Sequence, residues 1–292
     1  MLFYKYEFKP VLEGVWLTGY LLSYLKMKSK TTKEVRISLD IGLTFLHAKL
    51  KDEMLYIKKE NIILKIPCMR FKKRDIFYIS SKGDLTKLAF FSNNKYYKLV
   101  ATGAYTSPTL EISGIHMHNI KGTTPIKDAQ RKVYLAKITR GDIVLDVCTG
   151  LGYTAITSMR RGARKVVTID NDINVLKMAE YNPWSRGLLS SKIDVLLGNA
   201  EDLVLNFQNN FFDKIIHDPP RFSLSGQLYS LDFYKELYRI LKTNGILFHY
   251  TGYPRKKSGL KLQKGIINRL KSAGFKILRV EKDYAIIAKK GN

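Results

Sequence analysis

The second half of the chain alternates short apolar runs with segments in which apolar residues recur at helical spacing. Five runs of mostly apolar residues, each of strand length, lie at 142–147, 165–170, 193–197, 212–217 and 245–250. Segments with helical spacing lie at 128–138, 154–159, 173–181, 201–207, 231–241 and 262–273. Strands that are buried on both faces read as continuous apolar runs, and their alternation with helices is typical of a parallel, doubly wound α/β sheet. Two last strands, at 276–280 and 284–288, have no helix between them and predict an antiparallel hairpin at the sheet edge.

The first 120 residues have a different pattern. Apolar residues from Val15 to Leu25 recur near helical spacing, which predicts one helix within the first 30 residues. From about residue 34 to 110, short alternating runs are separated by turn signals such as Lys82-Gly83-Asp84, as in a β-rich module. The clearest of these runs lie at 35–39, 62–66, 76–80 and 96–100. We therefore expect a small β-rich α+β domain over residues 1–120 and the α/β sheet over residues 121–292.

Composition adds a strong positive charge to this picture. The 292 residues include 50 Lys and Arg against 25 Asp and Glu, which gives a formal charge of +25. Heat-adapted proteins also carry many lysines, but they usually balance them with glutamates. The imbalance favours a polyanionic partner, and RNA is the partner that we expect.

The excess charge is concentrated in two regions. Residues 1–120 hold 20 basic and 10 acidic residues, including Lys72-Lys73-Arg74, with many tyrosines interleaved. This pattern suits an RNA-docking surface, and a solvated basic face over core tyrosines would look similar. Residues 251–292 hold 12 basic and 2 acidic residues.

Several classes of protein and site are disfavoured. Cys68 and Cys148 lie in unrelated contexts, so neither a disulfide framework nor a zinc site is expected. His116 and His118 are two residues apart with little besides Glu111 nearby, and we predict no metal there. The N-terminus lacks the apolar stretch of a signal peptide, and residues 11–25 are shorter than the roughly 20 that span a bilayer. These features predict a cytoplasmic protein.

A glycine-containing loop follows the strand at 142–147. It reads Asp146-Val-Cys-Thr-Gly-Leu-Gly-Tyr153, and its glycines allow a tight turn that brings backbone N–H groups close to a ligand. Asp170 ends the next strand, 24 residues after Asp146, where a carboxylate can accept both hydroxyls of a ribose. Nicotinamide dinucleotides use a similar arrangement, but the first glycine of their G-x-G-x-x-G loop is missing here.

These residues resemble motifs I and II of the class I S-adenosylmethionine-dependent methyltransferases. The resemblance implies that the loop lines the methionine and ribose parts of S-adenosylmethionine, that Asp170 binds the ribose, and that Cys148 replaces the first motif glycine. Gly198-Asn199-Ala200 resembles the Gly-Asp-Ala that meets the adenine amine, with Asn in place of Asp. The cofactor-binding residues expected in this way are Asp146, Cys148, Thr149, Gly150, Gly152, Tyr153, Asp170, Asn171, Asn199, Ala200 and Asp218.

The rigid stretch Asp218-Pro219-Pro220-Arg221-Phe222 follows the strand at 212–217 and forms the expected catalytic set. It resembles the Asp/Asn-Pro-Pro-Tyr/Phe signature of methyltransferases that act on the amines of nucleobases. An exocyclic amine is a poor nucleophile because its lone pair is delocalised into the ring. An Asp218 oxygen and the Pro219 carbonyl can each accept one amine N–H and turn that lone pair towards the methyl group. Arg221 stands where the signature has its stacking aromatic, and a rigid turn capping the strand is the structural alternative.

The substrate is expected to contact aromatic and basic side chains near this loop, namely Phe222, Tyr229, Arg255, Lys256 and Lys257. Phe222 can supply the stacking from the next position, or the Arg221 guanidinium can stack on the base. His217 and His249 end neighbouring strands and could relay a proton, although a buried structural imidazole is favoured.

A closer resemblance covers nearly the whole chain. It is carried by Pro108-Thr-Leu-Glu-Ile-Ser-Gly-Ile-His-Met-His118, Asn182-Pro-Trp-Ser-Arg186, His217-Asp-Pro-Pro-Arg-Phe222 and Phe248-His-Tyr-Thr-Gly252. Together with the glycine loop, these stretches are similar to an archaeal methyltransferase family associated with N4 of cytidine in ribosomal RNA. The resemblance implies N4,N4-dimethylcytidine as the product and ribosomal RNA or the small ribosomal subunit as the partner.

Three other functions remain open at this level. One is a tRNA methyltransferase acting on guanine N2 or adenine N6. Another is an aminopropyltransferase that makes polyamines, but its cationic substrate needs an acidic pocket, and Arg221 and Arg255 flank this one. The third is an RNA-binding protein with a vestigial cofactor pocket, which the presence of Asp146, Asp170 and Asp218 disfavours.

Overall fold

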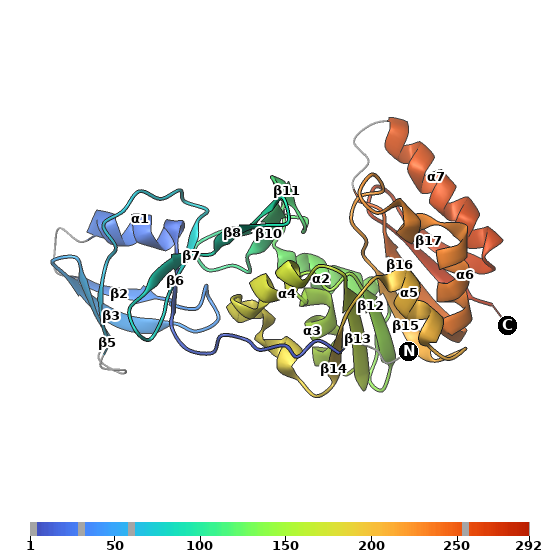
Figure 1. Ribbon diagram of the computed structural model, residues 1–292, viewed down its shortest axis with the longest axis horizontal. Coiled ribbons are helices and arrows are strands. Elements are labelled where there is room, and N and C mark those ends of the chain that lie inside the picture. The colour runs from blue at the N-terminus through green and yellow to red at the C-terminus, as the bar shows by residue number, and fades with distance from the viewer. Residues whose placement is uncertain (1–4, 29–32, 58–61, 253–256, 292) are drawn as a thin grey trace. The chain divides into compact units, whose positions relative to one another are not determined.

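The chain forms two compact units, each with its own apolar core (Figure 1). The computed structural model describes residues 5–28, 33–57, 62–252 and 257–291. The larger unit comprises residues 126–176 and 187–292 together with the first nine residues, and the smaller unit comprises residues 10–125 and 177–186. The assignment of residues 1–120 to RNA docking and of 121–292 to catalysis stays a prediction.

The larger unit contains a seven-stranded sheet in the order β14-β13-β12-β15-β16-β18-β17. The first five strands are parallel, and β18 pairs antiparallel with both β16 and β17. This confirms the predicted Rossmann-like sheet with its terminal antiparallel hairpin. The strands are β12 (Ile143–Val147), β13 (Lys165–Asp170), β14 (Ile193–Leu197), β15 (Phe212–His217), β16 (Leu241–Tyr250), β17 (Phe275–Glu281) and β18 (Ala285–Lys290).

Helices connect these strands and bury their apolar stripes against the sheet. Every residue of β12 is buried, as expected for a central strand covered on both faces. Leu237 and Ile240 of α6 and Ile266 of α7 share one core with Ile215 and other strand residues. The helices are α2 (Pro125–Leu135), α3 (Tyr153–Arg160), α4 (Ile173–Glu180), α5 (Ala200–Leu203), α6 (Leu231–Ile240) and α7 (Lys257–Ser272), with short turns η2 (Pro183–Leu189), η3 (Val204–Asn206) and η4 (Gly226–Tyr229).

The strand order reverses between β12 and β15, which are parallel neighbours. In open α/β sheets, ligands bind at such a switch point, outside the carboxyl ends of the strands. Asp146 lies near the end of β12, and Asp170 is the last residue of β13. Asp218 follows β15 directly. The carboxylates singled out in the sequence therefore lie at the same edge of the sheet.

The smaller unit is rich in strands. A four-stranded antiparallel sheet, β2-β3-β4-β5, packs its inner face against the apolar side of α1 (Gly19–Lys28) (Figure 1). Two further sheets have the orders β1-β6-β7 and β11-β10-β9-β8. The strands are β1 (Val15–Thr18), β2 (Lys33–Ile37), β3 (Leu46–Lys51), β4 (Met54–Ile57), β5 (Ile62–Lys65), β6 (Ile76–Ile79), β7 (Leu85–Lys87), β8 (Ala89–Ser92), β9 (Lys95–Val100), β10 (Thr109–Ile112) and β11 (Ile115–His116).

One expectation for the N-terminal region was wrong in detail. Val15–Thr18 is a strand paired with β6, and the helix begins only at Gly19. All four residues of this strand are buried. The apolar residues of this segment fit both the alternation of a strand and the spacing of a helix. The apolar pattern alone therefore does not distinguish the two structures.

Candidate active site

The loop between β12 and α3 adopts the conformation that its glycines permit. Gly150 and Gly152 have φ values of 53° and 76°, and Cys148 has a φ of 74° although it carries a side chain. A Cβ atom at Gly152 would lie 2.6 Å from Leu188. The loop therefore packs so closely that only glycine fits at 152, while Cys148 holds a left-handed conformation that glycine usually occupies. The resulting backbone cradle, which opens onto the first turn of α3, fits an anionic or polar ligand.

Asp146 is fully buried beneath this loop. Thr168 donates its hydroxyl to Asp146 Oδ2 at 2.8 Å, and the hydroxyls of Thr149 and Thr168 are 2.7 Å apart. Burial raises the pKa of the Asp146 carboxyl to about 7, with hydroxyl groups of Thr154 and Thr168 opposing the shift. The Thr149 side chain is thus engaged in the interior, and its backbone N–H donates to the Ile169 carbonyl at 2.9 Å, so Thr149 helps to fix the loop.

Asp170 connects the glycine loop to the end of β13. Its Oδ2 accepts the Gly150 N–H at 2.9 Å, and its Oδ1 accepts the Asp172 N–H at 3.0 Å. Burial raises the pKa of Asp170 to about 6, against these backbone hydrogen bonds. Each carboxylate oxygen has a second lone pair, so both can also accept a ribose hydroxyl.

The residues expected at the adenine end lie next to Asp170. The Asn171 side chain donates to Asn199 Oδ1 at 3.2 Å, and the Asn199 side chain donates to Asp202 at 3.3 Å. Asn199 precedes the first turn of α5, and Ala200 is buried. The structure therefore brings together the residues expected to hold the cofactor, from Asp146 to Ala200. This donor and acceptor set fits the methionine, ribose and adenine parts of S-adenosylmethionine.

Asp218 is engaged by a lysine that the sequence did not single out. Lys132 Nζ lies 2.5 Å from Asp218 Oδ2 and 3.1 Å from Asp128 Oδ2. Lys132 and Asp128 are almost completely buried, whereas 21% of the Asp218 side chain is exposed. An ammonium group thus bridges two carboxylates beside the glycine loop.

Aromatic rings enclose this ion-pair network. Lys132 Nζ lies 4.4 Å from the centre of the Tyr250 ring, and the Tyr284 hydroxyl donates to Asp128 Oδ1 at 3.0 Å. Burial alone would lower the pKa of Lys132, but Asp218 and Asp128 raise it, so the side chain stays charged. Burial raises the pKa of Asp218, and Lys132 opposes that shift.

The sequence contains a pattern that indicates this ion-pair network. Asp128 and Lys132 are spaced i, i+4 on α2 and lie beside the buried Ala129 and Val133. A charged pair next to the apolar stripe of a helix cannot be solvated, so it needs partners inside the protein.

The loop after Asp218 is held by Tyr229. The Tyr229 hydroxyl donates to the Pro220 carbonyl at 2.7 Å, and the Phe222 ring meets the Tyr229 ring edge-on, with centroids 5.4 Å apart. Phe222 is 46% exposed, and Arg221 is also exposed. Tyr229 is buried and supports the loop from the protein interior. Phe222 is therefore the ring of this pair that a ligand can reach.

His217 and His249 are buried and hydrogen-bonded. His217 Nε2 lies 2.9 Å from the Leu228 carbonyl, and His249 Nε2 lies 2.8 Å from the Tyr234 hydroxyl. Burial lowers the pKa of His217 to about 4 and that of His249 well below its usual range. Both imidazoles are therefore neutral at physiological pH, which fits the structural role favoured from the sequence.

Three of the predicted substrate-binding side chains are not described. Arg255 and Lys256 lie outside the described residues, as does the side chain of Lys257 at the start of α7. His118 Nδ1 lies 3.0 Å from the Thr109 hydroxyl, and His116 contacts Arg74 and Glu111. Within the described ranges, no three His, Cys, Asp or Glu side chains form a group that could hold a metal ion. No helix in these ranges is long and apolar enough to cross a membrane.

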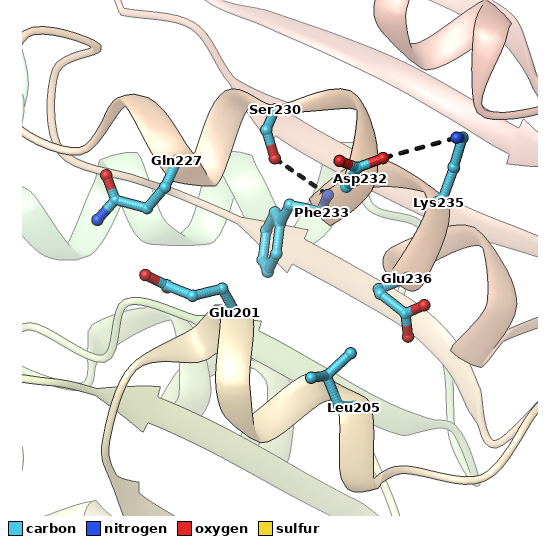
Figure 2. A pocket seen from close by; sticks show the side chains of 8 residues that line it. All are labelled: Glu201, Leu205, Gln227, Ser230, Asp232, Phe233, Lys235 and Glu236. Atoms are coloured by element: carbon cyan, nitrogen blue, oxygen red, sulfur yellow. Dashed lines mark hydrogen bonds and ion pairs between the residues drawn. The ribbon is translucent and has the colours of Figure 1, made fainter.

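A cavity of about 300 Å³ opens between α5, η4 and the first turns of α6 (Figure 2). Glu201 lines one side, and Gln227 and Phe233 line the other. Glu201 follows Ala200 directly, so the cavity adjoins the expected adenine end of the site. Its walls do not include the glycine loop or the Asp218 loop, and we assign it no separate role.

Comparison with known proteins shows which family the chain belongs to. Residues 144–245 match a family model described as "Methyltransferase domain". "Uncharacterized protein MJ1233" from Methanocaldococcus jannaschii is 43% identical over 270 residues, which cover 89% of this chain and 90% of that protein. The ribosomal protein L11 methyltransferase of Shouchella clausii is 29% identical over 174 residues, which cover 58% of this chain and 50% of that protein.

Among solved structures, spermidine synthase from Thermotoga maritima matches with a TM-score of 0.55 and 16% identity, over 98% of this chain and 83% of that one. At this identity the likeness shows a shared fold. The matched methyltransferase domain contains the glycine loop, Asp170, Asn199 and Asp218. The chain therefore belongs to the same family as MJ1233, within the class I S-adenosylmethionine-dependent methyltransferases, and its cofactor is S-adenosylmethionine.

Proposed function

We propose that the protein methylates an exocyclic base amine in RNA, namely N4 of cytidine in ribosomal RNA, with N4,N4-dimethylcytidine as the product. The observation that carries the proposal is Asp218-Pro219-Pro220 at the switch point of the sheet, with one carboxylate oxygen held by Lys132. A carboxylate and a rigid carbonyl in this position are suited to a planar amine. The base and the RNA are inferred from the resemblance and from the charge of the chain.

The chain's own residues would hold the cofactor in a fixed orientation. S-adenosylmethionine supplies an electrophilic methyl group on a sulfonium centre. Asp170 would accept the ribose hydroxyls, and Asn199 would face the adenine amine. The loop from Cys148 to Gly152, whose left-handed backbone turns tightly between β12 and α3, would line the methionine part. A site built in this way contributes mainly orientation and fixed dipoles.

Asp218 and Pro219 would act as an amine clamp. Lys132 binds Asp218 Oδ2, which leaves Oδ1 to accept one N–H of the amine, and the Pro219 carbonyl would accept the other. Both hydrogen bonds draw the nitrogen lone pair out of the ring and towards the methyl group. The hydrogen bond from the Tyr229 hydroxyl to the Pro220 carbonyl supports the loop next to this clamp.

The exposed side chains of the loop would contact the nucleotide. Phe222 is the accessible ring next to the clamp and would stack on the base, as aromatic side chains do on unstacked RNA bases. Arg221 is exposed beside it and would meet a phosphate. Arg221 would thus bind a phosphate, whereas the aromatic residue that usually stands at its position stacks on the base.

Incubating the purified protein with isotopically labelled S-adenosylmethionine and unmodified ribosomal RNA tests the proposal. Nucleoside mass spectrometry should detect labelled N4-methylated cytidine. Asp218→Ala should abolish the product and leave cofactor affinity within a few-fold, because the carboxylate contacts the amine. Asp218→Asn should also lose most of the activity, because its single amide oxygen cannot accept from both Lys132 and the amine, and its NH2 group is only a donor.

Two results would contradict this function. A product with the methyl group on guanine N2 or adenine N6 of tRNA would move the substrate to another RNA. Turnover of a polyamine with decarboxylated S-adenosylmethionine, without RNA methylation, would make the protein an aminopropyltransferase. Calorimetry on Asp218→Ala separates a lost clamp from a lost cofactor site.

A further inference from the structure

In the smaller unit, one face of the four-stranded sheet β2–β5 is exposed to solvent over the described residues. The four strands β2 to β5 alternate strictly, with Val35, Ile37, Leu50 and Leu55 turned towards α1. The other face is solvent-exposed, and strand pairing aligns its residues across the sheet, with Arg36 opposite His47, Lys49 opposite Tyr56, and Tyr56 opposite Ile63. We call this the outer face of the β2–β5 sheet. Its side chains are those of Glu34, Arg36, His47, Lys49, Lys51, Met54, Tyr56, Ile63 and Lys65.

The outer face is basic. Arg36, Lys49, Lys51 and Lys65 are all exposed, and Glu34 is its one acidic member. Among the described residues, these four cations have no carboxylate within salt-bridge distance, in contrast to Lys87 and Lys98, which both bind Asp75. Unpaired cations on a flat surface attract a polyanion and release its counterions.

The same face also exposes flat apolar groups. Tyr56 is 36% exposed in the middle of the sheet, and Ile63, opposite it, is 61% exposed. Phe45, just before β3, is 43% exposed, and the Arg36 guanidinium lies 4.7 Å from the centre of its ring. Rings surrounded by cations are the features with which sequence-tolerant proteins bind single strands, since bases stack on the rings while lysines follow the phosphates.

We propose that the outer face of the β2–β5 sheet is a platform for single-stranded RNA, with Tyr56 stacking on a base and Lys49, Lys51 and Lys65 binding phosphates. The Phe45 ring is held between Arg36 and Tyr105, whose ring centre lies 5.1 Å away, and borders the platform. The choice of RNA over another polyanion rests on the proposed function. A second copy of this chain is a poor occupant because two such faces would repel each other. A duplex keeps its bases stacked and would gain nothing from Tyr56.

The test measures binding of the full-length protein to a fluorescein-labelled oligocytidylate RNA of roughly 12 nucleotides by fluorescence anisotropy. Tyr56→Ala should weaken binding about five- to tenfold, and Tyr56→Phe should bind like the unsubstituted protein because it retains the ring. The same Tyr56→Ala change should leave binding to a duplex RNA of equal length unaltered.

Two double variants test how much the lysine charges contribute to single-strand binding. Lys49→Gln with Lys51→Gln should weaken single-strand binding and reduce the slope of log K against log salt by about 1.4, or about 0.7 for each phosphate that is no longer neutralised. Lys82→Gln with Lys95→Gln removes the same charge from exposed positions in the β6–β7 turn and on β9, which belong to other sheets, and should change binding little. Equally weakened binding in both double variants would overturn the platform and indicate non-specific attraction.

Failure of the platform can be told apart from failure of the proposed function. If Tyr56→Ala binds the oligonucleotide normally while the protein still methylates ribosomal RNA, the platform is wrong and the function stands. If the variants lose binding as expected while no RNA is methylated, the platform stands and the function is wrong. Light scattering that shows dimers dissociated by Lys49→Gln with Lys51→Gln would identify the face as a self-association surface and overturn the proposal.

Discussion

At the scale of single residues, Lys132 gives the candidate active site its electrostatic balance. Its ammonium lies between Asp128, which is almost completely buried, and Asp218, whose side chain is partly exposed. The network carries one net negative charge when all three groups are ionised. That charge favours the sulfonium of the cofactor and the positive charge that develops on an amine during methyl transfer.

Lys132→Met should move the acidic limb of the pH–activity profile to higher pH. Lys132 lowers the pKa of Asp218, whereas burial and the charge of Asp128 raise it. Without the ammonium, Asp218 becomes protonated at a higher pH, and a protonated carboxyl loses an acceptor for the amine. Initial rates measured across pH at saturating cofactor provide the readout.

Asp128→Asn is the matched control for this variant. It removes the carboxylate that raises the pKa of Asp218, while an amide oxygen can still accept the Tyr284 hydroxyl. The acidic limb should therefore stay in place or move downwards. The groups facing the pair from other elements, Asp146, Tyr229 and Tyr250, are unchanged in both variants. An upward shift of the limb in both variants would rule out the electrostatic role.

The proximity of the three candidate carboxylates was predictable from the sequence. Asp146, Asp170 and Asp218 lie at or near the ends of apolar strands, and parallel strands bring their carboxyl ends to one edge. Lys132 was not predictable in the same way. Its partner Asp218 is 86 residues distant, and only packing of α2 against the sheet makes them neighbours.

At the scale of elements, the strand-loop-helix unit β12–α3 has little conformational freedom. Three of its loop residues, Cys148, Gly150 and Gly152, have positive φ. Gly152 precedes α3, and η2 places Leu188 directly against it. The cofactor cradle thus depends on backbone conformation and on close packing from a separate segment.

Gly152→Ala should destabilise the protein by about 2 to 3 kcal/mol and weaken cofactor binding at least tenfold, since the new methyl group meets Leu188 and φ stays positive. Gly141→Ala is the matched control, because its φ is 92° and nothing lies within 4 Å of the added atom. It should cost about 1 kcal/mol from backbone strain alone. Thermal unfolding and titration calorimetry would compare them, and equal destabilisation by the two changes would refute the packing argument.

The elements of the parallel sheet were predictable, whereas part of the smaller unit was not. Buried parallel strands are continuously apolar, so their limits are visible in the chain. β3 and β4 were missed because Asp52 and Glu53 form their turn, both with positive φ, in place of the usual Gly or Asn. The short helix α5 continues as the 3₁₀ turn η3, where one helix was expected over 201–207.

At the scale of the whole molecule, the charge of +25 is the property most directly tied to an RNA partner. It is spread over both units, with a large excess of basic residues in 1–120 and in 251–292. Such a field attracts any polyanion at long range and gives little base specificity. Specificity would then depend on the clamp at Asp218 and on stacking.

Binding of ribosomal RNA should weaken by two to three orders of magnitude between about 50 and 200 mM salt if roughly six phosphates are contacted. Affinity for S-adenosylmethionine should change less than about threefold over the same range, because the cofactor's contacts are mostly hydrogen bonds in a buried site. Anisotropy and calorimetry at several salt concentrations would measure both. RNA affinity that does not respond to salt would contradict a charge-driven association.

The sequence by itself determined the parallel sheet, the cofactor class and the position of the Asp218 loop after a buried strand, because apolar periodicity and short-range motifs specify local conformation and strand ends. Only the tertiary structure revealed the Lys132 bridge, the Tyr229 support beneath Pro220 and the basic outer face of the β2–β5 sheet. These features join residues that are distant in the chain or lie on strands without a clear turn signal. Their positions follow from which apolar faces pack together, and that choice is made by the folded chain as a whole.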